Sequence, residues 1–441
     1  MPKTNFIIQP GGCLRGEIQV PGDKSISHRF VMLGAIAEGE STASGFLQGE
    51  DTLATVAAFR SMGVKIEGPE DGKIRIHGVG IHGLQAPQQP LDMGNSGTAM
   101  RLMSGLLAGQ RFDSALLGDV SLNQRPMSRV IDPLRTMGAH IDSAEAGRPP
   151  LRMHARQTPL AAIDYTSPVA SAQVKSCILL AGLYADGCIV IHESATTRDH
   201  TERMLRSFGV ALNVDGLSVS MQGGASLSSQ DIVIPADISS AAFFMAGACI
   251  AEDSSLVLKD VGINPSRTGI LHVLKLMGAD IRALNEHHEG GELVADLHIN
   301  YRPLNGITIP TEVVPLAIDE FPAVMVAAAF AHGDTVLRGA SELRVKESDR
   351  IASVTAGLRA LGVSVDEFDD GLCVHGGEVG GGNVESRGDH RIAMAFTMAG
   401  LGATQPITIS DCANVNTSFP GFLELASQCG LGISQQSVSG Q

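Results

Sequence analysis

Long apolar segments of helical length recur along the chain. Small and branched apolar residues occupy almost every position in them, a pattern typical of helices that are buried on all sides. We expect such buried helices at residues 28–37, 99–108, 172–183, 240–251, 322–331 and 390–401.

A second pattern follows each apolar segment. An amphipathic stretch ends in a glycine, as in LRTMG (134–138), and polar and apolar residues then alternate. The glycine follows the last helical turn, where the backbone turns through a positive φ that a Cβ disfavours, and the alternation predicts a strand. The motif occurs at residues 59–67, 134–142, 205–213, 274–282, 358–366 and, in a weaker form, 426–434.

The two patterns together predict an α/β chain built from six copies of one unit. Each copy runs from a buried helix through strands to an amphipathic helix, a glycine and a further strand. Both patterns occur in the same order in all six copies, which chance similarity among helix ends does not explain. Six units suggest two pseudo-symmetric halves of three. We expect seams near residues 233–239 and 20–25, and the pattern leaves open which half the N-terminal strand joins.

Charged and hydroxyl residues gather at the starts of the predicted helices. A cation is unfavourable there, by a few tenths of a kcal/mol up to about 1 kcal/mol, because the positive end of the helix dipole lies at the N-terminus. Repeated cations at such positions are explained by a bound polyanion, held by helix ends and guanidinium groups together. The alternatives are solvated surface charge and, for the serines, the threonine and the acidic pair, simple helix capping. The residues concerned are Lys24, Ser25, Arg29, Asn95, Gly97, Thr98, Arg125, Ser171, Gln173, Arg198, Asp319, Glu320, Lys346, Glu347, Arg350 and Arg391.

The composition argues against several classes of protein. A net charge of −15 and an aromatic content of 4% disfavour nucleic-acid binding, which uses a basic face and aromatic stacking. The seven cysteines show no C-x-x-C spacing, which predicts reduced thiols in a cytoplasmic protein. We expect no membrane partner, because the N-terminus lacks a signal-peptide pattern and the longest apolar stretch, residues 238–251, is too short to span a bilayer.

Two common ligand motifs are absent. Lys24 lies in GDKS, which lacks the spacing of a phosphate-binding P-loop. His28, His200 and His390 lack the i, i+4 spacing of an H-E-x-x-H zinc site. We therefore expect no metal, and a hydrogen-bonding or anion-facing role for each histidine.

At these residues the sequence resembles the enolpyruvyl transferases, and within them the EPSP synthases. The similarity runs from PGDKSISHR (21–29) to TSFPGF (417–422) and includes GNSGTAMR, QRPM, SAQVKS, RVKESDR and DHRIAM in the family's order. SAQVKS, TRDHTE and ELRVKESDR are similar to the class II branch, which is microbial and often glyphosate-tolerant. The resemblance implies an inside-out α/β barrel fold, with two domains of three βαβαββ units that close about a hinge. It places the first strand with the C-terminal half, so the expected domains are residues 1–20 plus 235–441 and residues 21–234.

The resemblance also implies an activity, the transfer of the enolpyruvyl group of phosphoenolpyruvate (PEP) to the 5-hydroxyl of shikimate 3-phosphate through a tetrahedral adduct. It implies no cofactor and no metal; the expected partners are the two substrates and the inhibitor glyphosate, and the chain is expected to be a monomer. Asp319 is the expected base for the hydroxyl proton, and Glu347 and Lys24 are expected to bring a proton to the PEP methylene. The expected shikimate 3-phosphate contacts are Lys24, Ser25, Arg29, Ser171, Ala172, Gln173, Arg198, Asp319 and Lys346, and the expected PEP contacts are Lys24, Asn95, Gly97, Arg125, Gln173, Arg350 and Arg391.

The sequence departs from the family's pattern at two positions and differs from some class II members at a third. Thr417 stands where many members carry a Lys, so one PEP-side charge is missing here or supplied elsewhere. Glu342 stands where many carry an Asn, so that contact is not carried over. Some class II members have an Ala at the position of Gly97, where it is thought to crowd out glyphosate, and with Gly that block is absent.

The sequence alone leaves two other functions open. The cell-wall enolpyruvyl transferase, which acts on UDP-N-acetylglucosamine, shares the fold but usually carries a reactive Cys before its Arg-Pro motif, and residues 118–126 contain none. A non-catalytic anion-binding or RNA-end-processing relative is disfavoured by the acidic net charge and by the presence of both Asp319 and Glu347. Phosphate release from PEP that depends on shikimate 3-phosphate, and not on the UDP-sugar, would separate the three.

Overall fold

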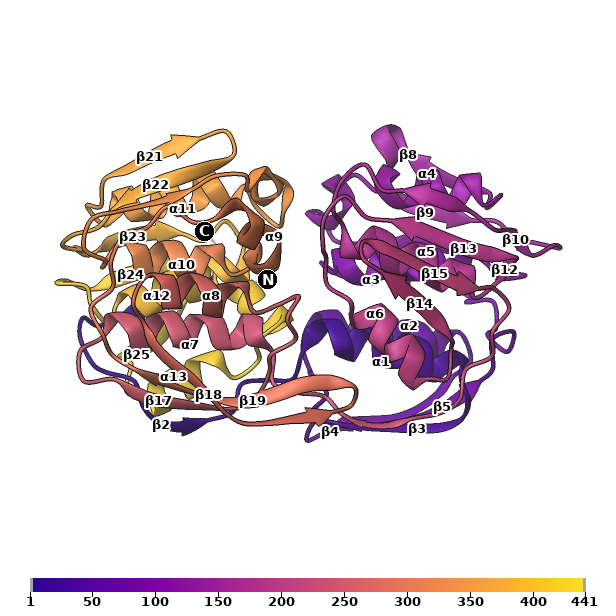
Figure 1. The fold of residues 1–441 in the computed structure, drawn as a ribbon, viewed down its shortest axis with the longest axis horizontal. Helices are drawn as coiled ribbons and strands as arrows, with labels where there is room; N and C mark the ends of the chain where they lie inside the picture. Colours follow the sequence, from indigo (N-terminus) through magenta and orange to yellow (C-terminus); the bar gives the residue numbers. More distant parts are fainter. Residues whose placement is uncertain (1–2, 439–441) are drawn as a thin grey trace. The chain divides into compact units, whose positions relative to one another are not determined.

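The computed structural model describes residues 3–438 and divides the chain into two units. Unit 1 comprises the described residues up to Pro21, together with Pro235–His288 and the residues from Leu293 onward. Unit 2 comprises Gly22–Ile234 and the short segment Glu289–Glu292. The chain therefore passes from one unit to the other close to both seams named above (Figure 1).

The apolar segments form buried helices, as predicted. In the fourth of them every residue is buried, because no position carries a charged side chain. The buried helices are α1 (Lys24–Ile36), α3 (Gly97–Ala108), α5 (Ala172–Gly182), α7 (Ile238–Ile250), α10 (Phe321–Ala328) and α12 (His390–Ala399).

Short polar side chains begin most of these helices. An oxygen of the N-cap residue accepts a hydrogen bond from a backbone N–H of the first turn, which satisfies a donor that the helix leaves unpaired. Helix α10 is different, because its N-cap residue Glu320 makes no such bond and Pro322 lies in its first turn. The side-chain caps are Asp23, Ser96, Ser171, Asp237 and Asp389.

The amphipathic helices also lie where the repeated motif predicts them. A glycine with φ between +85° and +114° follows each one, and an L-residue with a Cβ would be strained there. The helices are α2 (Glu50–Ser61), α4 (Ser128–Thr136), α6 (His200–Ser207), α8 (Gly269–Leu276), α11 (Arg350–Ala360) and α13 (Phe422–Gln428). Their glycines are Gly63, Gly138, Gly209, Gly278, Gly362 and Gly430.

Several short helices occupy connections. They are α9 (Val314–Ala317) and the 3₁₀ turns η1 (Leu122–Gln124), η2 (Glu145–Gly147), η3 (Thr311–Val313), η4 (Ser341–Val345) and η5 (Ala413–Thr417). Three of them, η1, α9 and η4, end one or two residues before Arg125, Asp319 and Lys346 of the predicted site.

Unit 2 contains three four-stranded sheets in the orders β16-β3-β5-β4, β6-β7-β9-β8 and β11-β13-β15-β14. In each sheet the first two strands are parallel and the last three antiparallel, which is the pattern of a βαβαββ unit. The strands are β3 (Glu38–Ser44), β4 (Lys65–Glu70), β5 (Lys73–Val79), β6 (Leu91–Asp92), β7 (Ser114–Leu117), β8 (Ile141–Ala144), β9 (Arg148–Met153), β11 (Asp164–Thr166), β13 (Cys188–His192), β14 (Leu212–Asp215), β15 (Ser218–Gln222) and β16 (Asp231–Val233), with a separate pair β10 (Leu160–Ala161) and β12 (Ala185–Asp186).

Unit 1 repeats this plan in the orders β18-β19-β17-β2, β20-β22-β21 and β23-β24-β1-β25. In the three-stranded sheet, a single parallel bridge from Thr308 to Val336 takes the place of the fourth strand. The strands are β1 (Lys3–Ile8), β2 (Arg15–Ile18), β17 (Ser255–Gly262), β18 (Asp280–Glu289), β19 (Glu292–Asn300), β20 (Asp334–Leu337), β21 (Val365–Phe368), β22 (Gly371–His375), β23 (Gly382–Glu385), β24 (Ile407–Ser410) and β25 (Ile433–Val438).

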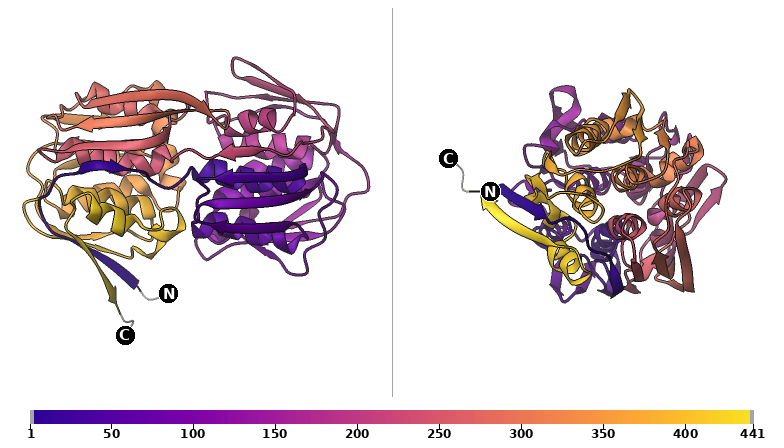
Figure 2. Two further views of the ribbon diagram at one scale, coloured as in Figure 1. Left: turned by 90° about the horizontal axis from the view of Figure 1, so that it is seen from below. Right: turned by 90° about the vertical axis from the view of Figure 1, so that its left-hand side faces the viewer.

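Strand pairing explains how the chain enters and leaves unit 2. Strand β2 precedes α1 in the sequence but pairs with β17 in unit 1, whereas β16 precedes α7 but pairs with β3 in unit 2. Strand β1 lies between β24 and β25 and completes the last repeat (Figure 2). Both N-terminal strands therefore belong to unit 1.

The predicted order within a repeat needs one correction. The sequence interpretation placed several strands before the amphipathic helix and one after the glycine. In the structure one principal strand comes before that helix and a hairpin follows it, as β3 comes before α2 and β4–β5 after it. The two strands of each hairpin are joined by a short turn. A period-two pattern therefore does not show where the first strand ends and the second begins.

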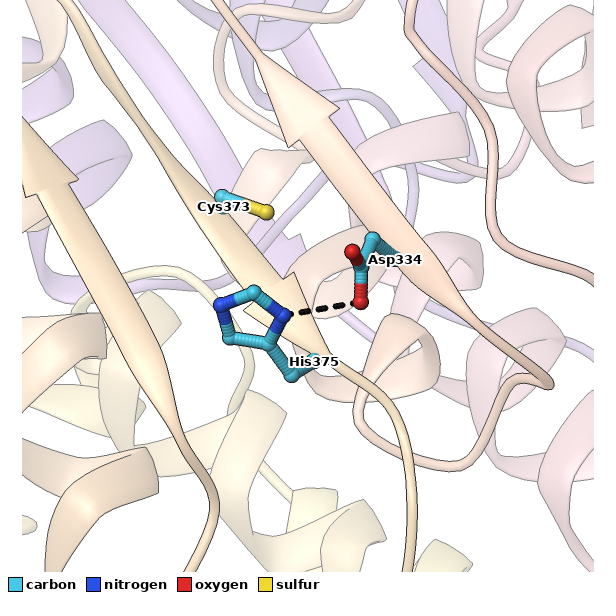
Figure 3. Close-up of side chains that lie close together, drawn as sticks. All are labelled: Asp334, Cys373 and His375. Atoms are coloured by element: carbon cyan, nitrogen blue, oxygen red, sulfur yellow. Dashed lines mark hydrogen bonds and ion pairs between the residues drawn. The ribbon is translucent and has the colours of Figure 1, made fainter.

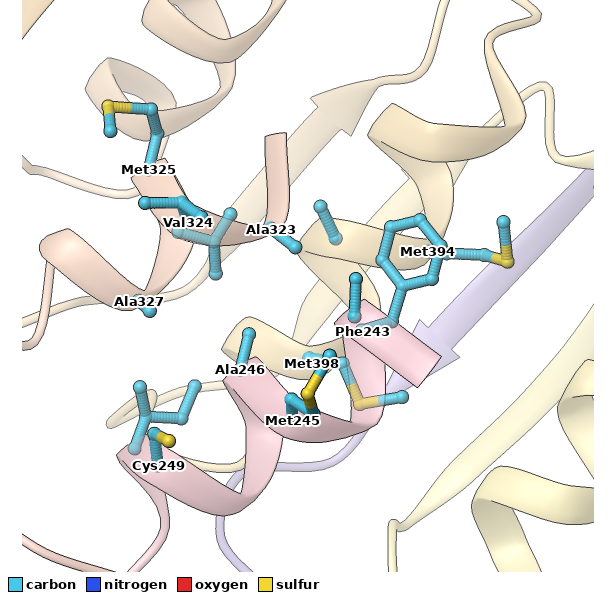
Figure 4. Close-up of a cluster of buried hydrophobic side chains, with 14 of the residues drawn as sticks. Phe243, Met245, Ala246, Cys249, Ala323, Val324, Met325, Ala327, Met394 and Met398 are labelled. Atoms are coloured by element: carbon cyan, nitrogen blue, oxygen red, sulfur yellow. The ribbon is translucent and has the colours of Figure 1, made fainter. Parts of the chain in front are cut away.

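Each unit has a hydrophobic core of its own, formed by the buried helices inside and the sheets outside (Figure 2). In unit 1 the helices α7, α10 and α12 pack through small and flexible side chains (Figure 4). Ala246, Ala323 and Ala327 allow close approach of the helices, and Met394 and Met398 fill the remaining space. The arrangement matches the α/β class and the inside-out barrel that the resemblance implied.

Candidate active site

The first turns of α1, α3 and α5 lie together in unit 2. His28 on α1 lies 3.3 Å from the Oγ of Ser96, the residue that caps α3, and 2.8 Å from Thr55 Oγ1 on α2. Gln173 on α5 donates from Nε2 to Thr98 Oγ1 on α3 at 2.9 Å. These bonds connect α1 to α3 and α3 to α5 near their first turns, and a helix N-terminus favours an anion. We call the predicted site residues of unit 2 the unit 2 cluster. They are Lys24, Ser25, Arg29, Asn95, Gly97, Arg125, Ser171, Ala172, Gln173 and Arg198.

Lys24 is the first residue of α1 and forms an ion pair with Asp51 in the first turn of α2. The lysine side chain is partly exposed and the aspartate is buried. Asp23, which precedes Lys24, caps α1 by accepting a hydrogen bond from Ile26 N at 2.8 Å. The ammonium group is thus held at a helix start by a carboxylate from the neighbouring helix, which compensates for its unfavourable position against the helix dipole.

Arg29 is buried between α1, α5 and α6. Its guanidinium donates to Thr201 Oγ1 at 2.7 Å, to Ser176 Oγ at 2.9 Å and to the carbonyl oxygen of Ser25 at 2.9 Å. These bonds fix Arg29 rigidly and tie it to the partly exposed first turn of α1. Arg198 lies two residues before α6, the helix whose first turn supplies Thr201.

Asn95, Gly97 and Arg125 form a second part of the unit 2 cluster. Arg125 donates from Nη2 to Asn95 Oδ1 at 2.7 Å, and Asn95 in turn donates to Asp119 Oδ2 at 2.7 Å. A Cβ at Gly97 would lie 3.2 Å from Arg125 Nη1 and 2.9 Å from Arg101 Nη1. The missing side chain at Gly97 therefore lets two guanidinium groups approach the start of α3.

Gln173 joins α5 to this group. Its Oε1 accepts a hydrogen bond from Arg101 Nη1 at 2.7 Å, while its Nε2 is held by Thr98. Ser171 caps α5 with a long bond of 3.4 Å from Val174 N, and Ala172 is the first residue of the helix. Ser171 was open to a capping interpretation, and the structure shows that it is the cap; Thr98 lies within α3 and is not.

His28 is neutral within the unit 2 cluster. Burial, followed by the positive charges of Lys24 and Arg29, lowers its pKa well below the usual range. The histidine bonds to hydroxyl groups on both ring nitrogens, which is the hydrogen-bonding role expected from the sequence.

Unit 1 contains a cluster of charged residues around Arg350, the first residue of α11. The guanidinium donates to Asp389 Oδ2 at 2.9 Å through Nε, to Glu347 Oε2 at 2.5 Å through Nη2, and to Asp319 Oδ1 at 3.1 Å through Nη1. Arg350 and Asp389 are fully buried, whereas Asp319 and Glu347 are partly exposed. A buried cation thus holds two carboxylates at the surface of the unit.

Asp319 also contacts two other cations. Lys346 Nζ lies 3.2 Å from Asp319 Oδ1, and Arg391 Nη1 donates to the Asp319 carbonyl oxygen at 3.0 Å. Arg391 Nη1 lies 3.6 Å from Oε1 of the buried Glu320, which accepts a further hydrogen bond from Ser239. Glu320, the N-cap residue of α10, makes no side-chain capping bond. The Asp319 carboxylate contacts cations, and the Glu320 carboxylate lies beside Arg391. We call Asp319, Lys346, Glu347, Arg350 and Arg391 the unit 1 cluster.

Opposing effects set the protonation of the buried ion pair. Burial disfavours the charge on Arg350, but the carboxylates of Asp389, Glu347 and Asp319 outweigh it and raise the pKa of the guanidinium above its usual value. Burial would likewise raise the pKa of Asp389, and the charge of Arg350 reverses this and lowers it. Both groups are therefore ionised at neutral pH.

The sequence reasoning missed three residues that hold the predicted ones in place. Asp51 pairs with Lys24, Arg101 bonds to Gln173, and Asp389 binds Arg350. Arg101 and Asp389 lie within the motifs GNSGTAMR and GDHR, so a helical spacing argument and a search for acidic N-caps could have found them. Asp51 comes from a separate helix, and no sequence signal links it to Lys24.

The two departures from the family's pattern lie in unit 1. Thr417 is buried at the end of η5, where its hydroxyl donates to the Asn414 carbonyl oxygen at 2.7 Å. A neutral, internally bonded side chain thus stands where many members carry a lysine. Glu342 lies in η4 and is half-buried, close in sequence to Lys346.

Comparisons with known proteins show one family throughout. Residues 8–425 match EPSP synthase (3-phosphoshikimate 1-carboxyvinyltransferase). The chain is 61% identical to a 3-phosphoshikimate 1-carboxyvinyltransferase of Methylococcus capsulatus, covering 97% of this chain and 98% of the relative, and 58% identical to that of Alkalilimnicola ehrlichii, covering 99% and 98%. A solved structure of EPSP synthase from Acinetobacter baumannii superimposes with a TM-score of 0.89 at 53% identity, covering 99% of this chain and all of that one.

The helices give no sign of a membrane span. Within residues 3–438, none is both long enough and apolar enough to cross a bilayer. The longest helices that the structure describes, α1 and α7, have only 13 residues each.

Proposed function

The chain belongs to the EPSP synthase family, and on that basis we propose that it transfers the enolpyruvyl group of PEP to the 5-hydroxyl of shikimate 3-phosphate. The family match over 418 residues, from 8 to 425, carries this proposal. In the reaction the 5-oxygen bonds to C2 of PEP while C3 gains a proton. The tetrahedral adduct then loses that proton and inorganic phosphate, which leaves the enol ether.

Asp319 is the proposed base for the 5-hydroxyl proton. Its carboxylate lies between Lys346 Nζ and Arg350 Nη1, at 3.2 Å and 3.1 Å, and two adjacent cations favour the ionised form that a base requires. It is partly exposed, so a substrate hydroxyl can reach it. Lys346 is proposed to contact the sugar-ring hydroxyls from the same side.

Glu347 and Lys24 are proposed to carry the proton to and from the PEP methylene. Glu347 is held by Arg350 at 2.5 Å, which limits its motion, and Lys24 is held by Asp51. Glu347 belongs to the unit 1 cluster and Lys24 to the unit 2 cluster. Positioned proton transfer typically contributes about 10²–10⁴-fold to the rate.

The remaining cations are proposed to bind the anionic groups. PEP is assigned to Asn95, Gly97, Arg125, Gln173, Arg350 and Arg391, and shikimate 3-phosphate to Ser25, Arg29, Ser171, Ala172, Gln173 and Arg198. Guanidinium forks and helix N-termini are the groups that hold phosphate and carboxylate best. Cations fixed before the reaction stabilise the charge that develops on the departing phosphate.

Steady-state phosphate release tests the activity. We expect release from PEP with shikimate 3-phosphate and none with UDP-N-acetylglucosamine, as the match to EPSP synthases implies. Asp319→Asn should abolish most of the turnover. Release that depends on the UDP-sugar, or an absence of release with either acceptor, would contradict the proposal.

We further propose that the protein works as a cytoplasmic monomer and that glyphosate competes with PEP. Gly97 lets the guanidinium groups of Arg101 and Arg125 approach the start of α3, and guanidinium groups bind such an anion. Light scattering of the purified protein, at a concentration typical of the assay, tests the monomer, and an inhibition series at varied PEP concentration tests the competition.

A further inference from the structure

Three side chains with different metal-binding atoms meet on the sheet β20-β22-β21 of unit 1. Cys373 and His375 lie two residues apart on β22 and so share a face, and Asp334 lies directly opposite His375 on β20. Their sulfur, ring nitrogen and carboxylate oxygen lie within 4.8 Å of one another (Figure 3). Within residues 3–438 this is the one group of at least three such ligands at that spacing.

Asp366 adds a fourth polar group from β21. His375 Nδ1 lies 2.8 Å from Asp334 Oδ1, and Nε2 lies 3.1 Å from Asp366 Oδ2. A histidine that binds a metal through one nitrogen usually donates its other N–H to a carboxylate, which fixes the orientation of the ring. Asp366 is placed to accept from Nε2 while Nδ1 faces Asp334.

We propose that Asp334, Cys373 and His375 bind a zinc ion, with Asp366 orienting the imidazole. A mixed set of sulfur, nitrogen and oxygen ligands suits zinc, whereas calcium and magnesium prefer oxygen alone. Zinc binds a thiolate and a ring nitrogen without its proton, so uptake releases two protons to solvent: the Cys373 thiol proton and the Nδ1 proton that bonds to Asp334. Three protein ligands leave the fourth tetrahedral position for water, and the exposed Asp334 and partly exposed His375 give the ion a path from solvent.

The first repeat of unit 2 contains a close counterpart without the thiol. His77 on β5 lies between two acids, with Nδ1 3.4 Å from Glu40 Oε2 and Nε2 3.2 Å from Glu67 Oε1. Arg75 stands two residues before His77, as Cys373 does before His375, and its Nη1 lies 3.0 Å from Glu40 Oε1. A histidine between two acids is thus a recurring surface network in this fold, and Cys373 is the feature that distinguishes the proposed metal site.

The proposed site and the unit 1 cluster share no residue and use different elements. Asp334, Asp366 and His375 lie on β20, β21 and β22 and bond to one another, whereas Lys346 follows η4. Substitutions at Cys373 or His375 are therefore expected to leave phosphate release by the metal-free protein unchanged.

Cobalt titration of the untagged, metal-free full-length protein tests the site. We expect one equivalent of Co²⁺ to produce a thiolate-to-cobalt charge-transfer band, and Zn²⁺ to remove it by competition. Cys373→Ser should lose the band, and His375→Ala should weaken binding at least about tenfold. Asp366→Asn should keep the band but weaken binding about 10–100-fold, the usual cost of losing such an orienting carboxylate.

Matched controls are available in the same chain. Cys188→Ser removes an exposed thiol from unit 2, and His77→Ala removes the counterpart histidine; both should bind cobalt like the wild type. Near-ultraviolet circular dichroism of each variant checks that it is folded. His375 is partly exposed, so His375→Ala disturbs the packing less than a substitution of the buried Cys373. A wild type without the band at millimolar Co²⁺, a Cys373→Ser variant that keeps it, or an unchanged affinity in His375→Ala would each overturn the proposal.

Discussion

Arg350 and Asp389 form an ion pair in which neither side chain is more than 1% exposed, with Nε 2.9 Å from Oδ2. The aspartate also caps α12 by accepting from Arg391 N at 2.9 Å. The pair therefore links the start of α11 to the start of α12, the two helices that carry Arg350 and Arg391.

Replacing Arg350 by lysine tests this pair. A single ammonium cannot bond to Asp389, Glu347 and Asp319 together, so Arg350→Lys should lower the free energy of unfolding by about 1–3 kcal/mol, the usual cost of leaving a buried acceptor without its hydrogen bond. The midpoint of urea unfolding measures the loss. Arg338→Lys is the control, because its pair with Asp370 is exposed, and an Arg350→Lys midpoint no lower than that control would contradict the argument.

Asp319→Asn tests the proposed base. The amide has the shape of the carboxylate but accepts no proton, so kcat should fall by about 10²–10⁴-fold while the KM for PEP changes little. Phosphate-release kinetics give both constants. Glu312→Gln removes an exposed carboxylate in η3 and should behave like the wild type. A kcat for Asp319→Asn within twofold of the wild type would rule out the role.

Gly97→Ala tests the close approach of two guanidinium groups to the start of α3. The added Cβ would lie 2.9 Å from Arg101 Nη1 and 3.2 Å from Arg125 Nη1, so both side chains must move. The KM for PEP should rise about tenfold or more, the discrimination that one methylene gives in a fitted site. The glyphosate inhibition constant should rise with it. Gly377→Ala is the control, since a Cβ there meets nothing within 4 Å, and unchanged constants in Gly97→Ala would refute the prediction.

His28 should make stability depend on pH below neutrality. Its pKa is lowered in the folded protein, so the unfolded chain binds more protons than the folded one between the two pKa values. Stability is complete above the unfolded value of 6.5 and is lost as the pH falls from there toward the folded pKa, by about 1.4 kcal/mol for each unit of difference.

The substitution His28→Gln isolates this contribution. Glutamine is uncharged at every pH and can still bond to a hydroxyl group of Thr55 or Ser96, so the decline in urea midpoint between pH 7 and pH 5 should be smaller than in the wild type. Parallel declines in the two proteins would show that another group is responsible.

The apolar and amphipathic patterns predicted the helices and the turn glycines because these depend on local properties. A helix without polar positions can only be buried, and a helix that ends at positive φ favours glycine wherever it lies in the fold. Strand pairing was not predictable in the same way. The placement of β2 beside β17 and of β16 beside β3 depends on residues more than 180 positions apart.

The amino-acid sequence by itself determined the repeat, the α/β class and the family to which the chain belongs, since these reside in residue order and spacing. The partners of the site residues were decided by the tertiary structure. Lys24 meets Asp51, Gln173 meets Arg101, and Cys373 meets Asp334 because separate helices and strands bring them within a few ångströms. Hydrogen bonds and ion pairs require contact, and only the packing within each unit creates these contacts.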